Sequence, residues 1–300
     1  MATVTAPAGP QVMTGSRRPL KPAAWYVGRI VRYGMVILVG MVLLSPFILA
    51  FLGSFKTDRE ILSYPPTFLP TEWHPENWAR VWAASAGPGA TFPRWMFNSA
   101  FLAVVHAITN VFFCSLAAFA FARLRFPGKN LIFSLMLVTM MIPSAVFLVP
   151  GYILITQLGW INQYQSLIVP NIVSAFGIFL LTQFFKSIPR ELEEAAIVDG
   201  ANLWQIYWHL ILPLSRPALL TLTIIAFQSM FNAYLGPLLY MQDPSMYTMT
   251  VGLKLLQGQY YAAWNLILAG SMFSAIPILI IFFIFNKYFI EGIAYTGLKG

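Results

Sequence analysis

Six long apolar runs constrain the fold of this chain more than any other feature. They lie at about residues 33–53, 97–121, 131–155, 166–185, 215–238 and 266–286. A helix needs roughly 20 mainly apolar residues to cross a bilayer, whereas the strands of an outer-membrane barrel are alternating segments of roughly 10 residues. The runs therefore predict an all-α integral membrane protein with six transmembrane helices.

The balance of charged residues excludes an ordinary soluble protein. Only 9% of the residues are charged and 58% are hydrophobic, whereas soluble domains contain about 25% charged residues. A net charge of +8 would suit nucleic acid if the basic residues formed one soluble patch, but here they are divided among the connections between apolar runs. We therefore expect membrane lipid as a partner and no nucleic acid.

Lysine and arginine are shared unequally between the two sets of connections. Thirteen lie in the N-terminal segment, the second and fourth connections and the C-terminus, and five lie in the alternate connections. Basic residues favour cytoplasmic connections. This predicts an inner-membrane protein with both termini in the cytoplasm and with residues 54–96, 157–165 and 239–265 outside.

Composition also predicts the organisation of the chain. The N-terminus is rich in Pro, Ala, Gly and Thr, which is typical of flexible segments. We expect a flexible cytoplasmic tail at residues 1–32 and a six-helix membrane domain at residues 33–300. The domain should end in a cytoplasmic tail at residues 287–300.

The connection at residues 187–213, here called the hairpin, has the signals of two short helices and a turn. A proline and three glutamates near its start suit the first turn of a helix. Asp199 and Gly200 should end that helix, because glycine adopts the required turn easily. Asn202 can cap the second helix, which we expect to stop at Pro213.

The first of these helices has a small apolar face. Leu192, Ala195 and Ala196 recur at i, i+3 and i+4, which places them on one side of a helix. Such a face can fit a groove in another protein, because alanine lets two backbones approach closely. It can equally lie on the membrane surface as an amphipathic elbow, and periodicity leaves both interpretations open.

The hairpin is similar to the EAA signature of permease subunits of bacterial ATP-binding-cassette (ABC) importers. Three segments resemble the maltose-type carbohydrate permeases, and among them the second, shorter permease subunit: FARLRFPGK at 121–129, LEEAAIVDG at 192–200 within the hairpin, and the C-terminal residues 287–300. Leu210 stands where isoleucine is usual in the signature. The matching signature residues, with Asp199 beside them, are Glu194, Ala195, Ala196, Asp199, Gly200, Leu210 and Pro213.

This resemblance implies a function and a set of partners. The hairpin would be a coupling helix seated in a cleft of an ATPase, through the seven residues just named. The C-terminal tail would reach toward the ATPase through Gly297, Leu298, Lys299 and Gly300. The implied partners are a second permease subunit, two ATP-binding subunits that hold ATP and Mg, and an external solute-binding protein. The implied activity is import of a sugar or related polyol by alternating access.

The chain carries no chemistry of its own that we can identify. The phosphate-loop pattern G-x-x-x-x-G-K-[ST] is absent, and the three histidines lie on separate segments without metal-ligand spacing. We therefore predict no catalytic residue, no metal site and no cofactor in this chain. A proton-coupled secondary carrier is the alternative, but it usually needs a carboxylate inside the membrane, and all ten acidic residues fall outside the apolar runs.

Neutral amides within the apolar runs are the candidates for a solute pathway. They are Asn110, Asn171, Gln228 and Asn232. Each could instead form a hydrogen bond between helices. Phe231 and Ala233 flank Asn232 where relatives often have a tryptophan and an acidic residue, so the solutes of those relatives do not transfer to this chain.

Overall fold

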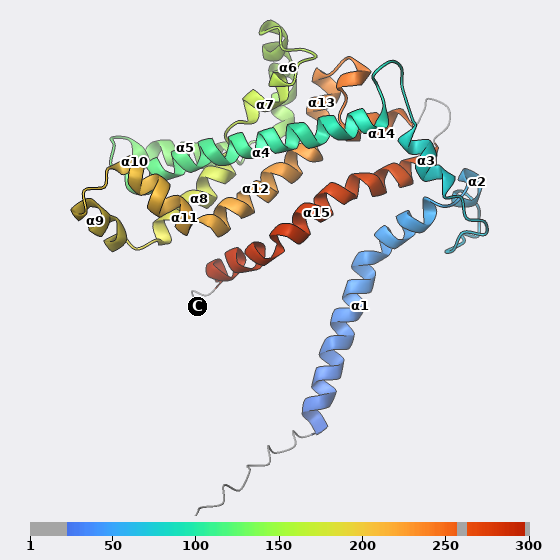
Figure 1. The fold of residues 1–300 in the computed structure, drawn as a ribbon, viewed down its shortest axis with the longest axis horizontal. Helices are drawn as coiled ribbons and strands as arrows, with labels where there is room; N and C mark the ends of the chain where they lie inside the picture. Colours follow the sequence, from blue (N-terminus) through green and yellow to red (C-terminus); the bar gives the residue numbers. More distant parts are fainter. Residues whose placement is uncertain (1–22, 257–262, 298–300) are drawn as a thin grey trace, which may run out of the picture. The chain divides into compact units, whose positions relative to one another are not determined.

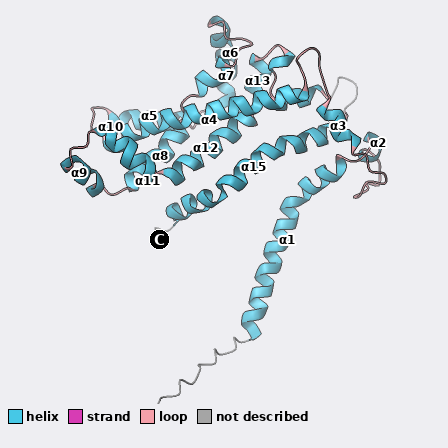
Figure 2. Cartoon of the chain, in the orientation of Figure 1, coloured by secondary structure: helices cyan, strands magenta, loops and turns pink. Residues whose placement is uncertain are grey.

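The protein is helical throughout the part that the structure describes. The computed structural model describes residues 23–256 and 263–297. These ranges contain helices and connections but no strand (Figure 2). Ser85 and Thr91 form one isolated bridge. The all-α prediction is confirmed. Most of the predicted N-terminal tail and the residues Leu298, Lys299 and Gly300 lie outside the described residues.

The chain divides into two compact units, Met1–Leu49 and Ala50–Gly300. Helix α1 (Ala23–Gly53) begins ten residues before the predicted run, so residues 23–32 are helical rather than part of a flexible tail. Likewise, the predicted C-terminal tail is helical from residue 287 to Gly297. The remaining elements in Figure 1 are α2 (Asp58–Ile61), α3 (Glu76–Trp82), α4 (Phe92–Arg123), α5 (Lys129–Thr139), η1 (Ser144–Phe147), α6 (Leu148–Gln157), α7 (Gln165–Ile168), η2 (Val169–Asn171), α8 (Ala175–Ser187), α9 (Glu191–Val198), α10 (Leu203–Ile206), η3 (Tyr207–Ile211), α11 (Leu212–Leu214), α12 (Arg216–Phe231), α13 (Leu235–Tyr240), η4 (Pro244–Met246), α14 (Met249–Leu255) and α15 (Trp264–Gly297).

Six spans are present if each bent pair of helices counts as one. Gly28–Gly53, α4 and Trp264–Ile284 are each long and apolar enough to cross a membrane. The other three are pairs, bent by 92° between α5 and η1–α6, by 40° between α7–η2 and α8, and by 78° between α10–α11 and α12. Proline explains the first bend, because Pro143 disfavours helical backbone in the residue before it. The sequence predicted six spans, and the prolines in or near its apolar runs predicted bent helices.

Helix α4 is the centre of the second unit and packs against α8 and α12 (Figure 1). Residues of α4 belong to all three buried clusters. One cluster lies near the middle of α4 and contains Leu102, Phe227 and Phe231. Another lies near the α9 end and contains Phe119 and Leu181. The third cluster lies at the α3 end of α4, where Phe92 and Trp95 meet α14 and α15. Burial along the whole length of α4 makes it the frame on which the other helices are placed.

At its α3 end, α4 is hydrogen-bonded to the segment that contains η4 and α14. The Trp95 indole donates to the Pro244 carbonyl at 2.8 Å, and the Asn98 amide donates to the carbonyls of Ser245 and Tyr247 at 2.9 Å each. The Ser99 hydroxyl accepts from the Met249 amide at 2.8 Å. These contacts fasten the segment 244–249 to the first two turns of α4.

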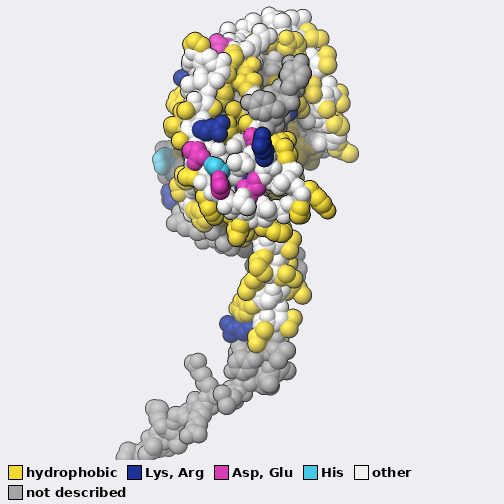
Figure 3. Space-filling view, turned by 90° about the vertical axis from the view of Figure 1, so that its right-hand side faces the viewer, with side chains coloured by type: hydrophobic (Ala, Val, Ile, Leu, Met, Phe, Trp, Pro, Cys, Tyr) yellow, Lys and Arg dark blue, Asp and Glu magenta, His cyan; other side chains and the backbone are white. Residues whose placement is uncertain are grey.

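Charged side chains of both signs gather over the end of the molecule that carries α2 and α3 (Figure 3). Lys56 is buried and forms an ion pair with Glu60 at 3.8 Å. His74 lies 2.6 Å from a carboxylate oxygen of Glu76. The Asn77 amide donates to the carbonyls of Ser54 and Lys56. These polar contacts hold the segment after α1 against α3.

Candidate functional site

The first helix of the hairpin begins and ends as its sequence predicts. Three glutamates occupy the first turn of α9, and its last residues form a Schellman motif. The Ala201 amide donates to the Ala196 carbonyl at 2.9 Å, and the Gly200 amide donates to the Ile197 carbonyl at 3.0 Å. Gly200 has a φ of +84°, a left-handed conformation that glycine adopts without steric cost. The turn at Gly200 is therefore confirmed.

The second helix starts at the predicted residue but does not stop at Pro213. Asn202 and Gln205 form a reciprocal capping box, with contacts of 2.9 and 2.8 Å. The helix then widens into the π-helical turn η3 and continues through Pro213 to Leu214. Proline usually breaks a helix because it has no N–H and its ring clashes with a carbonyl of the preceding turn. A wider π turn relieves that crowding, so the break comes at Ser215 instead.

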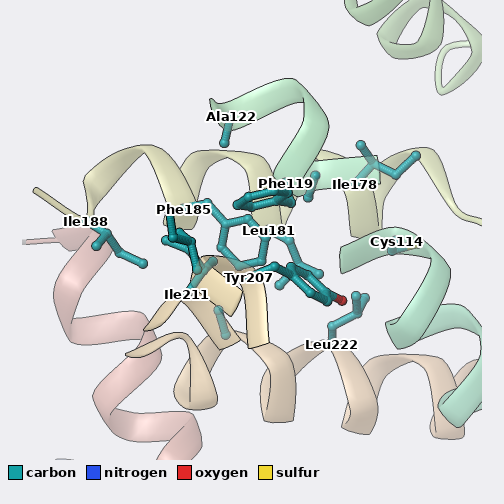
Figure 4. Close-up of a cluster of buried hydrophobic side chains, with 13 residues drawn as sticks. Cys114, Phe119, Ala122, Ile178, Leu181, Phe185, Ile188, Tyr207, Ile211 and Leu222 are labelled. Atoms are coloured by element: carbon teal, nitrogen blue, oxygen red, sulfur yellow. The ribbon is translucent and has the colours of Figure 1, made fainter. Parts of the chain in front are cut away.

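One face of the hairpin is buried against α4, α8 and α12 (Figure 4). The Tyr207 ring is fully buried beside Leu181, with its centroid 5.3 Å from that of Phe119. Its hydroxyl is hydrogen-bonded to the Ser115 hydroxyl of α4 at 2.7 Å. Ile206 and Ile211 complete the buried face. The second helix of the hairpin is thus fixed to the middle of the helix bundle by both packing and a buried hydrogen bond.

An ion pair fixes the first helix of the hairpin to the end of α4. Arg123, the last residue of α4, pairs with Glu193 and also donates to the Ile188 carbonyl at 2.9 Å. The side chains of Arg123 and Glu193 are 4% and 15% exposed. Burial raises the pKa of the Glu193 carboxyl, and the positive charge of Arg123 opposes that rise. The sequence predicted Glu193 in the first turn of a helix but not its ion pair, although Glu193 lies three positions before Ala196 and therefore on the inward side of α9.

The opposite face of the hairpin is exposed and carries most of the signature. Glu194, Ala195, Asp199 and Gly200 all face away from the bundle. Pro213 is exposed as well, whereas Ala196 and Leu210 are half-buried and pack on the buried cluster.

The apolar face predicted for α9 is thereby divided. Ala196 contacts the bundle, while Ala195 and Leu192 stay exposed beside Ile197 and Val198. The exposed side chain of Val198 keeps 88% of its surface accessible. The hairpin therefore presents a small apolar surface, edged by the carboxylates of Glu194 and Asp199, on a base that is anchored at two points.

The four candidate pathway residues fall into two pairs, one joined by a hydrogen bond and the other on one helix. Asn110 is buried, and its amide donates to the Asn171 carbonyl at 3.1 Å while its oxygen accepts from the Ser174 hydroxyl at 3.3 Å. These contacts satisfy the backbone at the break between η2 and α8, a role that polar side chains often take inside membranes. These contacts agree with the alternative interpretation of Asn110 as a hydrogen bond between helices, and its place on a solute pathway stays a prediction.

Two of the other candidates share a face. Gln228 and Asn232 are exposed and lie four residues apart at the end of α12, so they are neighbours on the helix surface. Gln228 also borders a mainly apolar cavity of about 320 Å³ between α12 and α15. Asn171 is exposed, and its amide donates to the Leu167 carbonyl of its own segment at 2.8 Å.

Gly200→Val is expected to weaken the hairpin without disturbing the bundle. No atom lies within 4 Å of a Cβ placed on Gly200, so the added side chain meets no obstacle in the chain. The backbone conformation disfavours the substitution instead. A β-branched residue at a φ of +84° raises the free energy of the folded hairpin by of order 1–3 kcal/mol. We expect reduced solute uptake with normal membrane insertion. Gly200→Asn is the matched control, since asparagine tolerates the left-handed region; equal loss in both variants would contradict the backbone explanation.

The sequence matches a known family over most of its length. The family described as "Binding-protein-dependent transport system inner membrane component" matches residues 110–295, which include the hairpin. The probable ABC transporter permease protein YurM of Bacillus subtilis (strain 168) is 32% identical, covering 92% of this chain and 90% of its own length. The permease protein AraQ of the arabinooligosaccharides transport system in the same organism is 31% identical over 88% of this chain and 93% of its own. The permease protein UgpE of the sn-glycerol-3-phosphate transport system in Yersinia enterocolitica is 32% identical over 86% and 93%.

A solved structure has the same fold. It is that of a bacterial ABC transporter involved in the import of the acidic polysaccharide alginate, which aligns with a TM-score of 0.76 at 24% identity over 91% of this chain and all of the other. A second structure, of a bacterial alginate ABC transporter in complex with an alginate pentasaccharide-bound periplasmic protein, aligns with a TM-score of 0.63 at 16% identity over 88% and 96%.

Proposed function

Since the chain belongs to the family of binding-protein-dependent transport system inner membrane components, we propose that it carries a sugar or related polyol across the membrane in an ATP-driven importer. As a permease subunit of an ABC importer it is a transport subunit and not an enzyme. The relatives support the class of solute, because they are named for arabinooligosaccharides and for sn-glycerol-3-phosphate. Both solutes carry hydroxyl groups, which neutral amides can bind.

The observation that carries the proposal is the two-sided hairpin. Its exposed face offers Ala195, Asp199 and Gly200, while its buried face is fastened to α4 through Arg123 and Tyr207. A surface that only rested on lipid would not need polar anchors into the bundle. Small residues on a rigid base suit close contact with another protein. We assign this contact to an ATP-binding subunit, with the hairpin as the coupling element.

The rest of the assembly follows from the same proposal. Two ATP-binding subunits bind ATP and Mg, a second permease subunit pairs with this chain, and an external binding protein delivers the solute. The unequal distribution of lysine and arginine supports an orientation with the hairpin and both termini in the cytoplasm. Gly297, at the end of α15, and the residues after it would then lie on the ATPase side.

The solute pathway would use the amide face at the end of α12. Exposed amides on a membrane helix require water, solute or a partner helix as hydrogen-bond partners. Gln228 and Asn232 meet that description, and we propose them, with Asn171, as groups that contact the solute. Closure of the ATPase pair would move the hairpin, and the two permease subunits would rock between inward-facing and outward-facing states.

Reconstitution of the importer tests this function. Purified alone, the chain is expected to show neither ATP hydrolysis nor uptake of a labelled solute into proteoliposomes, because it lacks a phosphate loop. Adding the second permease, the ATP-binding subunits and the loaded binding protein should produce uptake that depends on ATP. ATP-binding subunits that bind but do not hydrolyse ATP serve as the control. Uptake driven by a proton gradient without ATP-binding subunits would instead establish a secondary carrier.

A further inference from the structure

A basic cavity lies where α4 ends and α5 begins. Its volume is about 350 Å³, and Arg125 and Lys129 line it together with Leu131. The Lys129 ammonium donates to the Leu124 carbonyl at 2.8 Å, and this hydrogen bond fixes the position of the ammonium. Arg125 is exposed. The cavity therefore presents one fixed and one free cation to its surroundings.

Two further cations, one in the last turn of α8 and one at the start of α9, add to this charge. Lys186 and Arg190 lie close enough to Lys129 to repel it electrostatically, as does Arg125. The Lys186 ammonium is 5.5 Å from the centre of the Phe133 ring of α5, which places it beside that helix.

These four cations have no ion-pair partner among the described residues. The carboxylate of Glu193 lies within electrostatic range of Arg190 but forms its ion pair with Arg123. Mutual repulsion among four neighbouring cations is relieved when an anion binds close to them. This cluster, Arg125, Lys129, Lys186 and Arg190, is called the basic cluster below.

An apolar stripe continues from the cavity along α5. Leu131, Leu135 and Val138 recur at i, i+4 and i+7, and their side chains are 65%, 57% and 54% exposed. Leu131 belongs to both the cavity and the stripe. Helix α5 also starts one of the bent candidate spans, so the basic cluster lies at one end of a segment that is long and apolar enough to cross a membrane.

We propose that this site binds an anionic phospholipid. The basic cluster would hold the phosphate-containing headgroup, and the stripe on α5 would carry an acyl chain. Arginine and lysine at a membrane boundary attract anionic headgroups, and the arginine side chains can bind a phosphate with two parallel hydrogen bonds. An acidic protein surface could satisfy the charges, but it would leave the apolar stripe without a role.

The proposed lipid site lies next to the ion pair that anchors the hairpin. Arg125 lies two residues after Arg123, and Lys186 lies two residues before Ile188. Arg123 joins that same pair of segments to Glu193 of the hairpin. A bound headgroup would hold the ends of α4 and α8 together directly behind the anchor of the hairpin.

Native mass spectrometry of the purified, assembled importer tests the proposal. After exchange into mixed phosphatidylcholine and phosphatidylglycerol, the complex is expected to retain phosphatidylglycerol selectively. The double variant Arg125→Gln, Lys186→Gln should retain it about 30-fold more weakly, since each cation near the membrane surface contributes about fivefold. The control Arg80→Gln, Arg216→Gln removes the same charge at exposed residues away from the cavity and should keep the selectivity.

A second variant separates the lipid from other anions. Leu135→Ser keeps all four charges but interrupts the stripe, and should weaken retention of phosphatidylglycerol without creating any binding of inorganic phosphate. Equal retention in the double variant and the wild type would overturn the proposal. So would a double variant that keeps its phosphatidylglycerol but loses the ATP-binding subunits, because the basic cluster would then bind an acidic protein surface. These readouts measure binding and not uptake, so they stand or fall separately from the proposed transport function.

Discussion

Ala195→Leu is expected to remove most solute uptake while leaving the chain folded and inserted. Ala195 is exposed on α9, so a larger side chain meets nothing within the chain. In a closely packed groove of an ATP-binding subunit, the added atoms would cost about 1–3 kcal/mol. That cost weakens the association by roughly one to two orders of magnitude. The measurements are the rate of solute uptake and the amount of ATP-binding subunits that co-purify with the chain.

Two substitutions control this result. Ala195→Ser keeps the size of the side chain but makes it polar, so a docking surface should tolerate it and a membrane-bound elbow should not. Ala196→Leu alters the half-buried neighbour that packs on the bundle, and should therefore lower the stability of the chain itself. Normal uptake and normal co-purification for Ala195→Leu would refute the assignment of the hairpin as the coupling element.

Arg123→Leu is expected to destabilise the hairpin strongly, because it leaves the carboxylate of Glu193 with 15% exposure and no cation within ion-pair distance. Breaking a buried ion pair by removing one partner costs about 3–5 kcal/mol. The expected result is a lower unfolding temperature of the purified complex and a loss of uptake. Both can be measured on the same preparation.

The double variant Arg123→Leu, Glu193→Leu shows whether the ion pair itself is responsible. Replacing both members of a buried pair by apolar residues is often neutral for stability, so the double variant should recover much of the lost unfolding temperature. The Ile188 carbonyl would still lack its donor, which makes full recovery unexpected. A double variant no better than Arg123→Leu would show that the hydrogen bond to Ile188, and not the pair, holds the hairpin.

Local signals in the sequence predicted the local structure of the hairpin well. Gly200 and Asn202 act within one turn of the chain, through a backbone conformation and a capping box that need no other segment. The six spans were predictable for a similar reason, because hydrophobic length is itself local. Pro213 misled the prediction because proline breaks a regular α-helix, and the π turn before it was not visible in the sequence.

Contacts between distant segments were beyond the reach of sequence pattern. Asn110 and Asn171 were both candidates for the solute pathway, yet 61 residues of separation hide the hydrogen bond between them. Arg123 and Glu193 were assigned to different connections, so their ion pair could not be recognised from spacing. A polar residue inside a membrane helix has the same appearance in sequence whether it binds solute or repairs a break in a neighbouring helix.

Fastening α4 at both ends makes it a lever. It has 32 residues, and at a rise of 1.5 Å per residue it is about 48 Å long. Ser115 and Arg123 join one end to the hairpin, while Trp95, Asn98 and Ser99 join the other to residues 244–249. A tilt of about 10° around the hairpin would carry the far end through about 8 Å, given that length. A change of tilt that is barely visible at the hairpin would therefore displace residues 244–249 by more than the width of a sugar ring.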